Sequence, residues 1–224
     1  MENFMQLNNT VVRSEESIFQ TNKVIKNTYM LLSMTLIFSA ITAYISMAMG
    51  TGFGMALVAN IVAIALLWFV LPKTANSASG IPVIFAFTGL LGFGLGPMLA
   101  HYIAINPTIV STAMGGTGAI FIALSGYAIT TKKDFSFMGG FLAVGLFVLI
   151  GAMLLNIFLQ IPVLSLALSG GIILIMSGLI LYETSAIIHG GETNYIMATS
   201  SLFLSILNLF TALLHILGAL SGDD

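Results

Sequence analysis

Residues 195–220 read YIMATSSLFLSILNLFTALLHILGAL, a run of 26 residues that contains no Asp, Glu, Lys or Arg. A helix of this length is about 39 Å long, at about 1.5 Å per residue. The hydrocarbon core of a bilayer is thinner, at about 30 Å. Polar and apolar residues do not alternate along the run as they would in a membrane β-strand. We therefore predict that it forms a helix that spans a membrane.

Six more apolar runs precede it, separated by short turns. They lie at 28–49, 53–71, 81–102, 108–131, 136–159 and 162–188. Only 14 of the 224 residues are charged and 58% are apolar, whereas soluble proteins have about 25% charged residues. The sequence thus predicts an all-α integral membrane protein, a bundle of seven transmembrane helices. Residues 1–27 form a polar tail, 28–220 the membrane domain and 221–224 a short carboxyl end.

Composition and motifs exclude several classes of function. Six basic residues spread along the chain make no patch that could neutralise the phosphates of a nucleic acid. The chain has no cysteine, no HExxH motif and no lysine in its last run to hold a retinal Schiff base. His189 and Glu192 flank two glycines, a pattern that favours a turn over a metal site. We therefore expect no enzyme, no cofactor and no bound metal.

The basic residues predict the orientation in the membrane. When the sides of the bundle are assigned by alternation, all six fall on the side of the amino-terminal tail. They are Arg13, Lys23, Lys26, Lys73, Lys132 and Lys133. Because basic loops are retained in the cytoplasm, we expect the amino terminus inside and, after seven spans, the carboxyl terminus outside.

One face of the last run carries small and polar residues at steps of four and three. This face comprises Asn194, Ala198, Ser201, Ser205, Asn208, Ala212 and His215. Such residues concentrate where membrane helices pack, because backbones approach closely and hydrogen bonds form between helices. Gly89, Gly92 and Gly96 give the third run a similar face. We expect the last helix to be central, with Ser201 and Asn208 buried and Leu202 less closely packed.

Glu183 is the only acid well inside a predicted span, about five residues from its cytoplasmic end. A carboxyl group at this depth commonly marks a proton or ion path, because it is costly to bury. The alternative is a protonated or hydrogen-bonded side chain that only joins the last two helices. We group Glu183 with Thr184, Ser205 and Asn208 as a candidate proton, ion or interhelical site.

Several turns resemble those of a known family. The segments are NKVIKNTY, AFTG, TTKKDFSFMGG, NIFLQ and, above all, ETSAIIHGGETNY at residues 183–195. They are similar to segments of the transmembrane Bax inhibitor motif family, and the similarity extends from about residue 20 to residue 218. The resemblance implies a seven-helix bundle with the last helix central, in the bacterial inner membrane.

The resemblance points to the branch of this family that modulates the FtsH membrane protease. It implies that the chain binds FtsH with its HflK and HflC partners, both as a substrate and as an inhibitor. The tail, with Arg13, Glu15 and Glu16, would be the unstructured handle that the protease grips.

The alternative function is an ion or proton leak. Other members of the family leak calcium through a pair of aspartates on the last two spans. By resemblance, Glu183 keeps one of these acids, and Ser205 stands where the second would fall. A leak that depends on two acids is therefore not expected here.

Overall fold

The computed structural model describes the backbone of residues 2–221 and the side chains of residues 21–221. Within this part of the chain, seven helices are long and apolar enough to span a membrane. The α-helical segments, of which α2 and α3 belong to one span, are α1 (Glu2–Ala48), α2 (Phe53–Ala65), α3 (Leu71–Thr74), α4 (Gly80–Ile105), α5 (Pro107–Thr131), α6 (Gly139–Leu159), α7 (Pro162–Ile188) and α8 (Tyr195–Ser221). The described residues contain no strand, and the predicted all-α membrane fold is confirmed.

Turn residues set the ends of the helices close to the predicted positions. α5 and α7 begin with Pro107 and Pro162, since proline at the first helical position loses no intrahelical hydrogen bond. The Asn106 side chain caps α5 by accepting a hydrogen bond from the N–H of Thr108 at 2.9 Å. α6 ends where Gln160 adopts a left-handed conformation with φ 51°.

The second span runs past its predicted end at residue 71. It consists of α2, a π-helical turn at Leu66–Val70, and α3, which carries Pro72 and ends at Thr74. Proline has no N–H, and its ring would clash with the carbonyl of Trp68 in a regular α-helix. The wider turn just before Pro72 accommodates the ring, so the helix continues where the sequence predicted a break.

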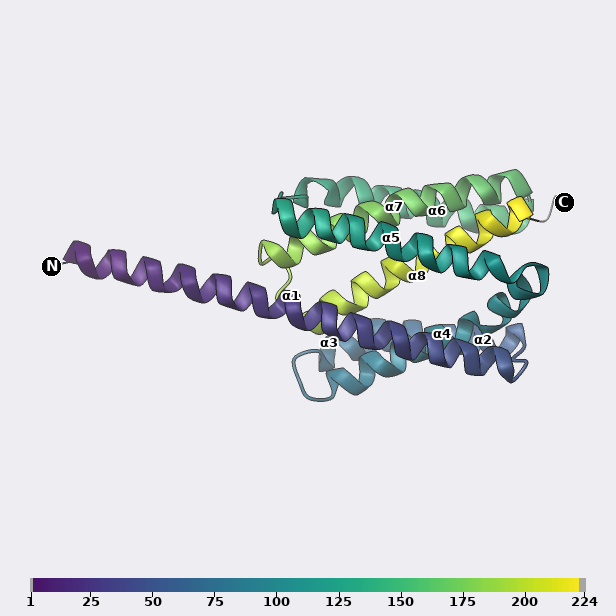
Figure 1. Ribbon diagram of the computed structural model, residues 1–224, viewed down its shortest axis with the longest axis horizontal. Helices are drawn as coiled ribbons and strands as arrows, with labels where there is room; N and C mark the ends of the chain where they lie inside the picture. The colour runs from purple at the N-terminus through teal and green to yellow at the C-terminus, as the bar shows by residue number, and fades with distance from the viewer. Residues whose placement is uncertain (1, 222–224) are drawn as a thin grey trace.

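The first helix is also longer than predicted. α1 begins at Glu2, and its apolar, membrane-spanning part is Thr21–Ala48. Residues 2–20 contain neither glycine nor proline, so nothing in this stretch breaks a helix. The expected unstructured tail is therefore corrected to a helix, which extends away from the bundle (Figure 1). The side chains of Arg13, Glu15 and Glu16, and residues 222–224, lie outside the described part.

α8 lies between two groups of helices, with α1 to α4 on one side and α5 to α7 on the other (Figure 1). It packs against α1, α4, α5 and α7, so the predicted central position is confirmed. Its predicted buried face is wrong in part. Leu202 is completely buried, whereas Asn208 is exposed and donates to the Leu204 carbonyl of its own helix at 2.9 Å. A helix enclosed by others buries large residues on several sides.

α4 packs against α1 through the predicted glycines. A Cβ atom at Gly92 would overlap the carbonyl oxygen of Ser39, and one at Gly96 would overlap the Ser46 side chain. Only glycine permits the two backbones to approach this closely. Any larger residue at Gly92 forces α1 and α4 apart.

The burial pattern of α8 reverses the expectation that Leu202 is less closely packed than Asn208, and it leads to a stability prediction. Leu202→Ala should lower the free energy of unfolding by about 1–3 kcal/mol, because packing contacts are lost and a cavity remains. Asn208→Leu should change it by less than about 0.5 kcal/mol, because the side chain is exposed. Thermal unfolding in detergent measures both, with Leu174→Ala on an exposed position as the control. Equal melting temperatures for Leu202→Ala and the control would contradict a central α8.

Candidate functional site

A cluster of polar side chains lies where α1, α5, α7 and α8 meet. The Ser205 hydroxyl on α8 donates to Oε2 of Glu183 on α7 at 3.0 Å. The Thr184 hydroxyl is 3.0 Å from the Tyr29 hydroxyl on α1 and 3.4 Å from that of Ser125 on α5. These residues come from segments far apart in sequence, so the polar cluster joins the two groups of helices.

The polar cluster is closely packed. Thr184, Ser205 and Ser125 are at most 3% exposed, and Glu183 is partly buried. Ser205 is the only side chain among those described that hydrogen-bonds Glu183. The carboxyl group therefore has a hydroxyl partner and no described basic partner. It can hold a proton or accept a hydrogen bond, but it lacks the second acid of a carboxyl pair.

The predicted candidate site is thus partly assembled. Glu183, Thr184 and Ser205 come together, whereas Asn208 is exposed and bonds its own helix. Tyr29 and Ser125 are members that the sequence analysis missed. A tyrosine near the start of a span and a serine in a mostly apolar helix give no local signal that they share a site. Only the packing of α1 and α5 against α7 brings them there.

A second group of polar contacts lies at the end of the bundle that carries the lysines. The Ser185 hydroxyl accepts a hydrogen bond from the N–H of Phe135 at 2.9 Å and donates to the Lys133 carbonyl at 3.3 Å. His189 places Nε2 3.1 Å from the Lys132 carbonyl and Nδ1 2.9 Å from the Ser185 carbonyl. The carboxyl end of α7 therefore holds the loop between α5 and α6.

The turn before α8 is held in the same way. The Asn194 side chain donates to the Ala75 carbonyl at 3.1 Å and to Oδ1 of Asn76 at 2.7 Å. The backbone N–H of Asn194 in turn donates to Oε1 of Glu192 at 2.7 Å. The loop after α3, the loop after α5 and the turn before α8 thus form one connected surface.

Two charged side chains on this surface have neutral hydrogen-bond partners. The N–H of Ser136 donates to Oδ1 of Asp134 at 2.8 Å, and this bond holds the pKa of Asp134 below its usual range. The neighbouring Lys133 ammonium donates to the Tyr127 hydroxyl at 3.2 Å. Among the described residues, no group of three or more His, Cys, Asp or Glu side chains could hold a metal ion.

Comparison with known proteins identifies similar sequences over nearly the whole chain. Residues 21–222 match the family model described as inhibitor of apoptosis-promoting Bax1. The chain is 50% identical to a protein of Escherichia coli strain K12 named modulator of FtsH protease YccA, over 92% of this chain and 94% of that protein. It is 52% identical to an uncharacterized membrane protein of Vibrio cholerae serotype O1, over 96% of this chain and 97% of that protein. A further relative, from Escherichia coli O6:H1, is named inner membrane protein YccA and is 50% identical over the same shares of the two chains.

Proposed function

This chain belongs to the family of inhibitors of apoptosis-promoting Bax1, and we propose that it binds and modulates an FtsH-type membrane protease as both substrate and inhibitor. The observation that carries the proposal is the extensive similarity to a relative named as a modulator of that protease. The expected partners are FtsH with HflK and HflC. The proposed location is the bacterial inner membrane.

The proposed orientation has the amino-terminal tail in the cytoplasm and residues 221–224 outside. The loop that follows Lys73 of α3 and the loop that carries Lys132 support it, because each is hydrogen-bonded to the segment that joins α7 to α8. Lys73, Lys132 and Lys133 therefore lie at one end of the bundle, and basic loops are retained in the cytoplasm.

The orientation can be tested by labelling, because the chain has no cysteine of its own. In intact cells, an impermeant maleimide should label a cysteine introduced at Ser221 and should not reach one at Ser77 or Thr193. Permeabilised cells, in which all three variants should react, provide the control. The opposite pattern in intact cells would reverse the topology.

The proposed inhibition rests on mechanical resistance to extraction. A processive protease that grips the tail pulls directly on α1, because tail and first span form one helix. A helix without tertiary contacts is only marginally stable, so the protruding part of α1 unfolds readily. The spanning part is held against α4 at Gly92 and Gly96 and against α8. The protease stalls when it reaches this packing. While it is stalled on this chain it cannot degrade other substrates, and it is therefore inhibited.

Two changes test this mechanism through the cellular half-life of the chain. Removing residues 2–15 should lengthen the half-life and leave FtsH co-purification intact, because the handle is shortened. Gly92→Leu should shorten the half-life severalfold, because overpacking at the α1–α4 contact costs about 1–3 kcal/mol. Gly115→Leu is the matched control, since a Cβ atom there meets nothing within 4 Å. Absence of FtsH from every pull-down would refute the proposal.

A proton or ion leak is the second candidate function, and the polar cluster at Glu183 is the observation that favours it. Hydroxyl groups of Thr184, Ser205, Tyr29 and Ser125 line the junction of four segments near this carboxyl group. A calcium site, however, needs six to eight oxygen ligands, commonly with several carboxylates. Glu183 alone supplies too little charge for a calcium path.

Calcium flux into proteoliposomes distinguishes the two candidates. The native protein should stay near the flux of protein-free vesicles. Ser205→Asp should create a pH-dependent flux, because two adjacent carboxyl groups share a proton and titrate as a pair. Ser205→Asn is the uncharged control of similar size. If the native protein leaks calcium strongly and Glu183→Gln abolishes the leak, the channel function replaces the proposed protease regulator.

A further inference from the structure

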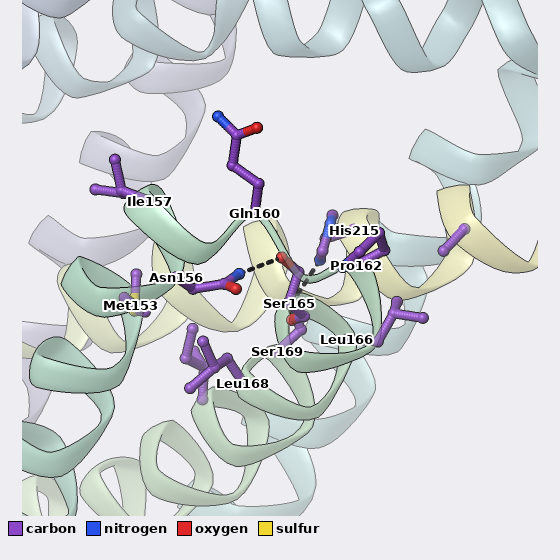
Figure 2. Close-up of a pocket in the computed structure, with 12 residues that line it drawn as sticks. Met153, Asn156, Ile157, Gln160, Pro162, Ser165, Leu166, Leu168, Ser169 and His215 are labelled. Atoms are coloured by element: carbon purple, nitrogen blue, oxygen red, sulfur yellow. Dashed lines mark hydrogen bonds between the residues drawn. The ribbon is translucent and has the colours of Figure 1, made fainter.

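A cleft of about 690 Å³ opens at the end of the bundle opposite the lysine-bearing loops, between α6, α7 and α8 (Figure 2). Its polar lining includes Asn156, Ser165, Ser169 and His215, which Figure 2 shows gathered around the junction of α6 and α7. None of the functions discussed above uses these residues. The cleft is therefore a separate feature that needs its own explanation.

A hydrogen-bond network shapes the polar part of the cleft. The Asn156 amide on α6 donates to the Ser165 hydroxyl oxygen on α7 at 2.7 Å. The Ser169 hydroxyl oxygen lies 3.1 Å from the Ser165 carbonyl oxygen and 2.8 Å from Nδ1 of His215 on α8. When the Ser169 hydroxyl donates to Nδ1, the neutral imidazole carries its proton on Nε2. Among the described residues, the Ser165 hydroxyl proton and Nε2 of His215 have no partner. Both groups remain available to a ligand.

The depth of these groups matches the boundary between lipid head groups and acyl chains. α7 has 27 residues and is therefore about 40 Å long, so it extends about 5 Å beyond each side of a hydrocarbon core about 30 Å thick. Ser165 is three residues from the start of α7 at Pro162, or about 4.5 Å along the axis. It lies at the edge of the hydrocarbon, and Ser169 lies one turn deeper.

The chemistry of the lining changes with depth. Apolar side chains line the rest of the cleft: Leu168 lies next to Ser169, and Met153 and Ile172 lie deeper. No described residue of the lining is charged. Anionic head groups and charged soluble ligands are bound through lysine or arginine clusters, which this cleft lacks. Neutral polar groups above an apolar wall fit the ester and glycerol oxygens of a lipid and the first part of its acyl chain.

The position of α6 supplies a second reason for an occupant. Of the 21 residues of α6, only Leu142 is buried, and α7 is its main packing partner. The cleft separates the outer part of α6 from α8, to which His215 belongs. A molecule seated in the cleft would touch α6, α7 and α8 together and give α6 a second support.

We propose that this cleft binds one diacyl phospholipid of the outer leaflet. Its ester oxygens accept hydrogen bonds from the Ser165 hydroxyl and from Nε2–H of His215, and one acyl chain lies along Met153, Leu168 and Ile172. The lipid holds α6 against the rest of the bundle. This role is independent of the proposed protease modulation, which concerns the tail and the opposite end of the bundle.

Lipid titration of the purified, delipidated protein tests the proposal. Dioleoyl phosphatidylethanolamine should bind at one saturable site by native mass spectrometry. Ser165→Ala combined with His215→Leu should weaken that binding about tenfold, because two hydrogen bonds are lost. The matched control is Ser111→Ala with His101→Leu, which makes the same changes at exposed positions outside the cleft. This control should bind lipid like the native chain.

A second variant separates loss of binding from loss of folding. Met153→Trp fills the apolar part of the cleft from a side chain that is 43% exposed and leaves the polar network in place. It should also weaken lipid binding while the helix content and elution volume stay native. Equal lipid binding by all variants, or no bound lipid in the native protein, would overturn the proposal. Saturable binding of glycerophosphoethanolamine, which has no acyl chains, would also overturn it in favour of a soluble polar ligand.

Discussion

Polar side chains inside the hydrocarbon must find hydrogen-bond partners within the protein, because no water is present there to satisfy them. In this bundle the requirement is met around α8. Ser205 of α8 bonds Glu183, and the adjacent Thr184 is within hydrogen-bond distance of Tyr29 and Ser125. α8 lies between the two groups of helices and packs against both, and α1 also contacts α7 directly at Tyr29 and Thr184. Its enclosure by α1, α4, α5 and α7 is the condition for the polar cluster.

That enclosure also explains which parts of the structure could be predicted from the sequence. The spans follow from the length and polarity of each run, and turn residues such as Pro107 and Pro162 mark where helices begin. Glu183 and Ser205 could be paired because both break an apolar pattern and the resemblance aligned them. The spans and turns follow from local sequence, and the Glu183–Ser205 pair follows from the family resemblance, so both could be predicted.

The remaining features depend on the surroundings of each helix. A stripe of small and polar residues identifies the buried face of a helix that has lipid on its other side. α8 has little such side, and therefore Leu202 is as buried as any polar residue while Asn208 is exposed. Tyr29 and Ser125 join the site through helices distant in sequence. Before Pro72, a π-helical turn allows the helix to continue, and residue identity alone does not predict this change in backbone geometry.

The two ends of the bundle are built differently, and this difference bears on how the protein could resist extraction. At the lysine-bearing end, Ser185, His189 and Asn194 tie three connecting segments into one surface. At the opposite end, α6 stands apart from α8 across the cleft. A force applied through the tail acts first on α1. This helix packs against α4 and α8, and its backbone approaches α4 closely at Gly92. The pulling force therefore acts on the most closely packed part of the bundle. The loosely packed α6 experiences this force only after α1 has been extracted.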